Sequence, residues 1–139
     1  MIKIKKIVVW LTAGTIMLGI GILTSKLFQY FKPSLQVEYE NTDLFRSMSD
    51  PIMMLCFIQP FALAFMLAWI WNLLKKVIKG VTSFQKGVNF GFIYWVITLP
   101  GLMFTFAFFS VSINLTLTWS VSIFFQGMAA GMLFSRMIP

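Results

Sequence analysis

The chain has 139 residues and a net charge of +7, and 59% of its residues are hydrophobic whereas only 11% are charged. Soluble domains carry about 25% charged residues, so this composition excludes a soluble globule covered by polar surface. The chain has no histidine and one cysteine, Cys56, which argues against zinc, copper and haem sites and excludes a disulfide within the chain.

Four apolar stretches dominate the sequence. They cover residues 7–31, 51–74, 88–109 and 113–134, with no acid or arginine, and with lysine only towards the end of the first. A hydrocarbon core of roughly 30 Å is crossed by about 20 helical residues, so each stretch predicts a transmembrane helix. We therefore predict an all-α membrane protein, an antiparallel four-helix transmembrane bundle that forms one integral domain over residues 1–139.

The first predicted helix follows three lysines and would fit either a cleaved signal peptide or an uncleaved anchor. Its length of about 25 residues and the lack of a small-x-small cleavage site favour the anchor. Gly14, Gly21 and Ser25 fall on one side of this helix, which predicts close packing of a neighbouring helix there. Lys26 lies near the end of the helix, where its ammonium group can reach the lipid headgroups.

Residues 32–50 form the long polar segment of the chain, and we predict that they form an outer loop. The apolar residues at positions 35, 37 and 39 alternate with polar ones, as in a strand. Residues 41–43 would cap a brief helix on the membrane surface, and Asp50 before Pro51 predicts the N-cap of the second transmembrane helix. We expect the acids and Arg46 to be solvated surface groups, with a cation or ligand site as the alternative.

The basic residues predict the orientation. Eight of them lie before the first helix, between the second and third, and after the fourth: Lys3, Lys5, Lys6, Lys75, Lys76, Lys79, Lys86 and Arg136. The opposite helix ends hold Lys26, Lys32, Arg46 and all four acids: Glu38, Glu40, Asp43 and Asp50. By the positive-inside rule, the chain is expected to be a multi-pass protein of the cell membrane, with both termini cytoplasmic and residues 32–50 outside.

The second and third helices each combine a proline with a polar residue near their middle. Gln59 precedes Pro60, and Thr98 lies two residues before Pro100. A proline removes one backbone hydrogen bond, so both helices are expected to kink close to the membrane midplane. Kinked helices with polar groups at mid-depth form the binding sites of many transporters. The alternative is that Gln59 bonds to a neighbouring helix.

The fourth helix carries polar and small residues in two sectors. Asn114, Thr118, Ser122 and Gln126 follow one another at four-residue steps, and Thr116, Ser120, Gly127 and Gly131 occupy a second sector. Polar groups lose their partners in lipid, so this helix is expected to lie between at least two others. A third, bulky sector is expected to face lipid: Leu117, Val121, Phe124, Phe125, Met128 and Met132.

Two GxxxG motifs predict close packing of the last two helices. They consist of Gly87 with Gly91 and of Gly127 with Gly131, and a tight turn near position 111 would place Gly91 level with Gly131. Homo-oligomerisation through the same glycines is the competing use.

No motif indicates catalysis. The sequence favours a structural, accessory or interaction subunit, not an enzyme, with no catalytic residue, no cofactor and no metal. Its expected partners are the lipid bilayer and either further copies of the chain or another membrane protein, but not nucleic acid. The alternative is a channel or transporter for a small neutral or weakly charged solute, lined by a midplane polar cluster of Gln59, Thr98, Ser122 and Gln126. A membrane enzyme would have to rely on Asp43, Arg46 and Asp50, since the carboxylates all lie in one loop.

Overall fold

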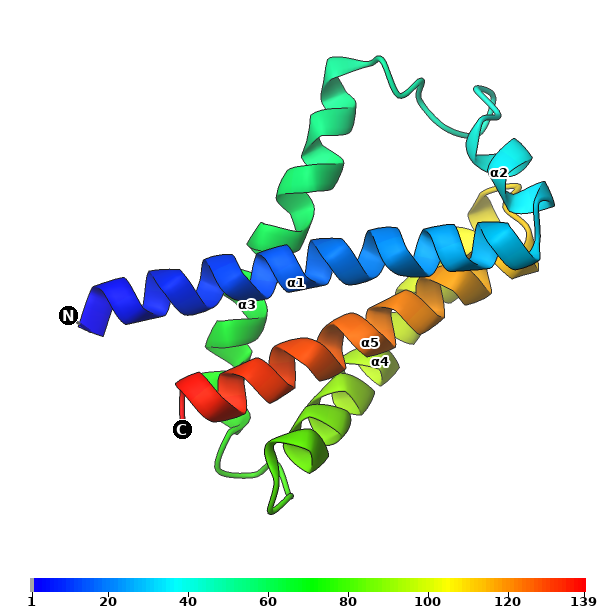
Figure 1. Cartoon of the computed structure of the whole chain (residues 1–139). Helices are drawn as coiled ribbons and strands as arrows, with labels where there is room; N and C mark the ends of the chain where they lie inside the picture. Colours follow the sequence, from blue (N-terminus) through cyan, green and yellow to red (C-terminus); the bar gives the residue numbers. More distant parts are fainter. Residues whose placement is uncertain (1) are drawn as a thin grey trace.

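The computed structural model describes residues 2–139, and within them the regular secondary structure is helical, without any strand. The elements in chain order are α1 (Ile2–Phe31), α2 (Ser34–Tyr39), the 3₁₀ helix η1 (Pro51–Met54), α3 (Leu55–Leu74), α4 (Ser83–Phe108) and α5 (Ile113–Met137) (Figure 1). α1, α3 with η1, α4 and α5 are each long and apolar enough to cross a membrane. The predicted all-α class and the four long apolar helices are therefore confirmed.

The helix boundaries follow from local capping. Asp50 is the N-cap of η1, as expected, because its carboxylate accepts a 2.9 Å hydrogen bond from the Ile52 amide. α4 begins at Ser83, five residues before the predicted start, because Thr82 and Gln85 form a capping box. The Thr82 hydroxyl accepts from the Gln85 backbone amide at 3.2 Å, and the Gln85 side chain accepts from the Thr82 backbone amide at 3.5 Å and also from the Val81 amide at 2.9 Å.

α5 is the helix around which the others are arranged. It packs along α4 on one side and against α1 on the other, whereas α3 crosses α1 steeply and touches α5 near one end (Figure 1). We call that end, which holds the α3–α4 connection, the lysine end, and the opposite end, which holds residues 32–50, the loop end. Towards the loop end α3 stands away from the other helices, so the four helices do not lie side by side over their whole length.

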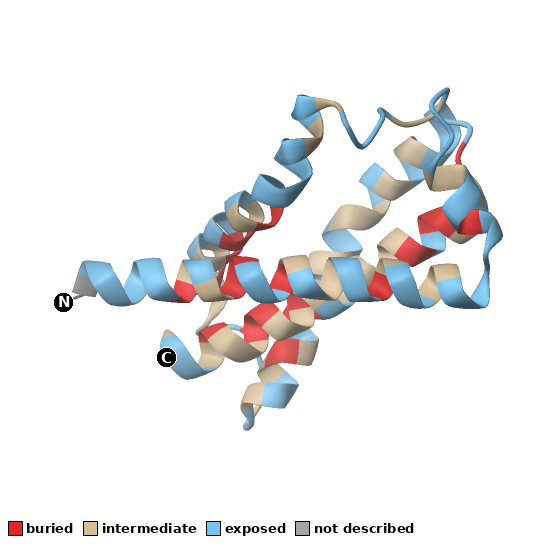
Figure 2. Cartoon of the chain, turned by 45° about the horizontal axis from the view of Figure 1, so that its top comes forward, coloured by how far each residue is buried: buried red, intermediate tan, exposed pale blue. Residues whose placement is uncertain are grey.

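Connection lengths explain this arrangement. Residues 109–112 join α4 to α5 through a connection so short that the two helices must be neighbours. Residues 40–50, in contrast, form a long irregular connection that allows the start of α3 to lie far from α2. The buried side of α3 begins at Pro60, and residues 55–59 are exposed (Figure 2).

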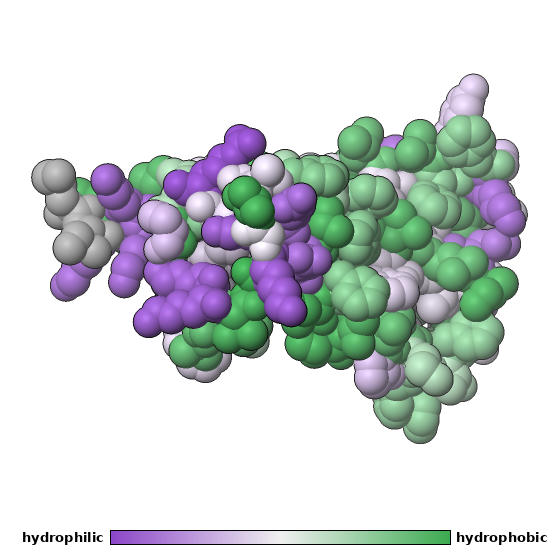
Figure 3. Space-filling view, turned by 90° about the horizontal axis from the view of Figure 1, so that it is seen from below, coloured by the Kyte–Doolittle hydropathy of each residue, from purple (hydrophilic) through white to green (hydrophobic). Residues whose placement is uncertain are grey.

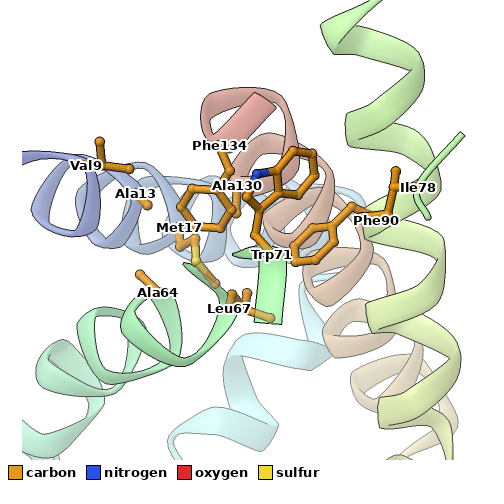
Figure 4. Packing of buried hydrophobic residues seen from close by; sticks show 10 residues of the cluster. All are labelled: Val9, Ala13, Met17, Ala64, Leu67, Trp71, Ile78, Phe90, Ala130 and Phe134. Carbon is orange, nitrogen blue, oxygen red and sulfur yellow. The ribbon is translucent and has the colours of Figure 1, made fainter. Parts of the chain in front are cut away.

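The main core lies at the lysine end, where three aromatic rings from three helices meet. Trp71 of α3, Phe90 of α4 and Phe134 of α5 are at most 2% exposed, and the Trp71 ring centroid lies 5.4 Å from that of Phe90 and 6.2 Å from that of Phe134 (Figure 4). The Trp71 indole donates a 2.9 Å hydrogen bond to the carbonyl of Ile138. Aromatic burial of this kind is a large stabilising term, so this cluster fixes α3 to α4 and α5.

A second, smaller core lies at the loop end. Leu35 of α2 is 1% exposed and packs with Val111 and Leu115 at the α4–α5 turn. The strand-like rhythm at positions 35–39 was therefore misleading, because the segment is helical. In a helix Leu35 and Tyr39 are four residues apart and fall on one face, which is the face that meets the turn. Residues 41–45 form a single turn in place of the expected brief helix.

Candidate functional site

The closest helix contact is the glycine seam between α4 and α5, formed by Gly87, Gly91, Gly127 and Gly131. A β-carbon built on Gly127 would lie 3.1 Å from the Cα of Gly91, and one built on Gly131 would lie 3.1 Å from the Cα of Gly87. A β-carbon built on Gly87, Gly91 or Gly127 would lie less than 3.0 Å from a backbone or ring atom of the opposite helix, a distance at which a side chain does not fit unless something shifts. The structure thus brings both GxxxG motifs together.

The register of this seam differs from the expected one by one helical turn. Gly91 is level with Gly127, not with Gly131, because α4 ends at Phe108 and residues 109–112 are extended before α5 begins. Two methionines of α5 also lie differently from the expectation. Met128 and Met132, which were expected to face lipid, pack against Gly91 and Gly87 instead.

Two of the three glycines of α1, Gly14 and Gly21, lie at two different helix contacts, whereas a β-carbon built on Gly19 has nothing within 4 Å. Gly14 meets the Phe61 ring of α3 and lies next to its backbone, with a built β-carbon 3.0 Å from the Phe61 Cα. Trp10, one turn before Gly14, donates its indole hydrogen to the Phe61 carbonyl. Gly21 meets α5, because a built β-carbon would lie 3.0 Å from the Gln126 amide nitrogen.

The contact at Gly21 has a specific polar function. The Gln126 amide donates a 2.9 Å hydrogen bond to the Met17 carbonyl, which lies one turn before Gly21 on α1. In a regular α-helix the Met17 carbonyl also accepts from the backbone amide of residue 21. The Gln126 side chain therefore reaches this carbonyl by passing over the position of residue 21. Glycine at this position leaves the space that the side chain of Gln126 needs.

The two polar sectors of α5 face different helices. In the first sector, Gln126 bonds to α1, and Asn114 accepts a 2.9 Å hydrogen bond from the ammonium group of Lys32, just beyond α1. In the second sector, Ser120 accepts a 2.8 Å hydrogen bond from the indole of Trp95 on α4. The expectation that α5 lies between two other helices is confirmed.

The four residues of the expected midplane polar cluster do not share one cavity. Gln126 is bonded to α1, whereas Thr98 donates to the carbonyl of Trp95 within its own helix at 2.8 Å. Ser122 is half-buried, and Gln59 is exposed on α3. Two hollows in the described part of the chain lie elsewhere, and none of these four residues lines them.

Those two hollows are shallow and lie at the loop end. One of about 200 Å³ lies where residues 48–57 turn into α3. The other, of about 470 Å³, lies between α1 and α5 and has mostly apolar walls, with Lys32 and Asn114 at its rim. Within residues 2–139 no group of three metal-ligating side chains comes together.

Glu38 makes a contact that the sequence did not indicate. Its carboxylate accepts hydrogen bonds of 2.6 Å from both the amide and the hydroxyl of Ser112, which is the N-cap of α5. A negative charge at a helix N-terminus is favourable because it opposes the helix dipole. Tyr39, the next residue, accepts a 3.0 Å hydrogen bond from the Trp119 indole. Glu38 and Tyr39 together fasten α2 to α5, so Glu38 is not the solvated acid that we expected.

Among the other charged groups of the loop end, Asp50 is half-buried and the rest are exposed. Arg46 and Asp50 form an ion pair of 3.2 Å four residues apart. The hydrogen bond from the Ile52 amide and the nearby Arg46 charge hold the pKa of Asp50 below its ordinary value of 3.8. The Asp50 carboxylate thus caps η1 and pairs with Arg46. Asp43 takes no part in this pair, and its backbone amide donates to the side chain of Asn41. The three residues considered for catalysis therefore do not converge on a common point.

Eight of the eleven basic residues belong to the helix ends and connection at the lysine end. Hydrophilic side chains cover that part of the surface, and most of the remaining surface in the same view is hydrophobic (Figure 3). Comparison of the chain with protein-family models, with curated proteins and with solved structures finds no match.

Proposed function

We propose that the chain is a multi-pass protein of the cell membrane that acts as a structural, accessory or interaction subunit. In this proposal its four long helices cross the bilayer in alternating directions, with both termini and the lysine end in the cytoplasm. The loop end, which holds the four acids, then lies outside. At 1.5 Å per residue α1 is about 45 Å long, so it must either tilt or extend beyond a hydrocarbon core of roughly 30 Å.

The observation that carries this proposal is the use of the polar groups within the apolar helices. Gln126 bonds to the backbone of α1, Trp95 bonds to Ser120 of α5, and Trp10 bonds to the backbone of α3. Each of these bonds joins two helices. Polar side chains used in this way hold transmembrane helices together, and they are then not available to a solute.

A flux measurement tests the proposal against transport. Proteoliposomes that contain the chain are expected to shrink and swell in glycerol, urea or a small sugar at the rate of protein-free liposomes. If the wild type gives flux above that background and Gln126→Leu does not, the accessory function is refuted. Circular dichroism of the variant must show unchanged helicity, because Gln126 also contributes to packing.

Labelling of single cysteines tests the orientation. In a Cys56→Ser background, a cysteine at Lys79 is expected to react with an impermeant maleimide only after the membrane is opened, and a cysteine at Asn41 is expected to react in intact cells. Labelling of both positions from the same side would contradict the proposed topology.

A further inference from the structure

α3 has two opposite faces, and one of them has no partner within residues 2–139. Its buried face consists of Pro60, Ala64, Leu67 and Trp71. The opposite face, which we call the open face, consists of six exposed residues that follow one another at alternating steps of four and three: Leu55, Gln59, Ala62, Met66, Trp69 and Leu73. Residues with this spacing lie along one side of a helix. The larger ones are 58–64% exposed, as expected for a surface that nothing covers.

Gln59 makes the open face unsuitable for lipid alone. It lies about 12 Å along the helix axis from Pro51, which places its side chain inside the hydrocarbon layer of the proposed arrangement. Within residues 2–139 its amide has no hydrogen-bond partner, whereas Asn72 on another side of α3 donates to the carbonyl of Ala68 at 3.0 Å. Acyl chains have no hydrogen-bonding groups, so an amide facing them loses its bonds to water without replacement.

The other helices of the same chain cannot supply the missing partner in this arrangement. The buried face of α3, which includes Trp71, packs on α1 and, at the lysine end, on α5. The open face lies on the opposite side of α3. Gln59 could meet α4 or α5 only if α3 rotated about its axis by about half a turn. That rotation would expose the side chain of Trp71, which is now 2% exposed. The partner must therefore come from outside the chain.

We propose that the open face of α3 binds the open face of a second copy, with the two Gln59 amides hydrogen-bonded to each other. A glutamine amide both donates and accepts, so it pairs with an identical group across a two-fold axis. Two copies with the same orientation in one membrane bring equal depths of α3 together, and therefore Gln59 next to Gln59. The alternating four-and-three spacing is that of the seam of a left-handed helix pair, in which one polar residue fixes the register and the number of chains.

This inference rests on the membrane location proposed above, and the experiment separates the two. The reporter is Ala62→Cys in a Cys56→Ser background, because Ala62 is exposed, small and one turn from Gln59 on the open face. The matched control is Met103→Cys in the same background, since Met103 of α4 is 71% exposed but lies on another helix. Both proteins are reconstituted in lipid vesicles at low protein density and oxidised with copper phenanthroline, and dimers are counted on non-reducing gels.

We expect the Ala62→Cys protein to form a disulfide-linked dimer and the Met103→Cys protein to form little. Adding Gln59→Leu to the reporter is expected to lower the dimer fraction by roughly fivefold, and Gln59→Asn, which keeps an amide, is expected to retain most of it. Equal cross-linking of the reporter and the control, or no effect of Gln59→Leu, would overturn the dimer.

Two further outcomes would also overturn the proposed pairing. A membrane-embedded, helical protein without any dimer at Ala62 would refute the pairing of copies and leave the membrane location intact. A cross-link from Ala62 to a different protein, found in native membranes but absent from vesicles that contain the purified chain, would assign the open face to that other partner. If the protein is recovered in the soluble fraction after alkaline carbonate treatment, the membrane location itself fails.

Discussion

The contact of α4 with α5 provides a sharp test at Gly91. A β-carbon at this position would lie 2.6 Å from the backbone nitrogen of Met128 and 2.9 Å from its Cα. These atoms belong to the backbone of α5, so they cannot rotate away as the end of a flexible side chain would. Ordinary contact begins at 3.4 Å, and α5 would have to move away from α4 by about 0.8 Å to restore it.

The magnitude follows from two opposing effects of Gly91→Ala. Overpacking of a close contact typically costs about 1–3 kcal/mol. Alanine in place of glycine within a helix contributes about 0.5–1 kcal/mol of stability. We therefore expect Gly91→Ala to lower the free energy of unfolding by up to about 2.5 kcal/mol.

A second glycine of α4 supplies the control. Gly101 has nothing within 4 Å of a built β-carbon, so Gly101→Ala retains the gain in helix propensity without the overpacking. Both variants and the wild type are unfolded with sodium dodecyl sulfate in mixed micelles and followed by far-ultraviolet circular dichroism. We expect Gly101→Ala to be as stable as the wild type or more stable. If Gly91→Ala and Gly101→Ala have equal stability, the close contact of α4 with α5 is refuted.

Three further predictions concern polar contacts. Glu38→Gln should speed amide exchange in the first turn of α5 severalfold because the charge-assisted bonds to Ser112 weaken, whereas Glu40→Gln, at an exposed site, should leave it unchanged. Gln126→Leu should lower the free energy of unfolding in mixed micelles by about 0.6 kcal/mol, the average for a hydrogen bond between membrane helices, and an unchanged value would mean that the bond to α1 contributes nothing. The pKa of Asp50 in the folded protein is depressed, so its cap on η1 is complete above the ordinary value of 3.8 and is lost as the pH falls through the folded value. After correction for intrinsic exchange, hydrogen exchange of the Ile52 amide should become faster in that pH range in the wild type. In Asp50→Asn it should be independent of pH.

The four long helices could be predicted from the sequence because a helix long and apolar enough to cross a membrane requires an uninterrupted apolar run. The predicted ends at residues 31, 51, 74 and 113 coincide with observed ends, since a charge, a proline or a turn begins there. The start of α4 was missed because hydropathy does not register the capping box of Thr82 and Gln85, which adds a helical turn of polar residues.

Helix neighbours could be predicted in part. The glycines of α4 and α5 and the polar sectors of α5 indicated which sides face protein, because small and polar residues are enriched there. The one-turn error in register arose from the α4–α5 connection, whose extended backbone at residues 109–112 was not evident from composition. The register of two antiparallel helices depends on that geometry, so spacing alone did not determine it.

The steep crossing of α3 and the contact of Glu38 could not be predicted, because both depend on residues far apart in the chain. Gln59 was considered as part of a midplane cluster because it lies at the right depth, but depth does not indicate the side of the helix that faces the other helices. Glu38 lies in a polar loop with three other acids, and nothing nearby in the sequence distinguishes it. Its partner, Ser112, is 74 positions away.

The position of α5 at the centre of the fold has a consequence for biosynthesis. α5 is the last of the four long helices to leave the ribosome, and yet it contacts each of the other three. Until it is inserted, α4 lacks the neighbour that covers its glycines, although α1 and α3 can already associate through Gly14 and Phe61. If translation stalled before residue 113, α1 and α3 would be associated and α4 would be without a partner. In the proposed membrane arrangement, insertion machinery or a membrane chaperone would then have to shield α4 until translation resumes.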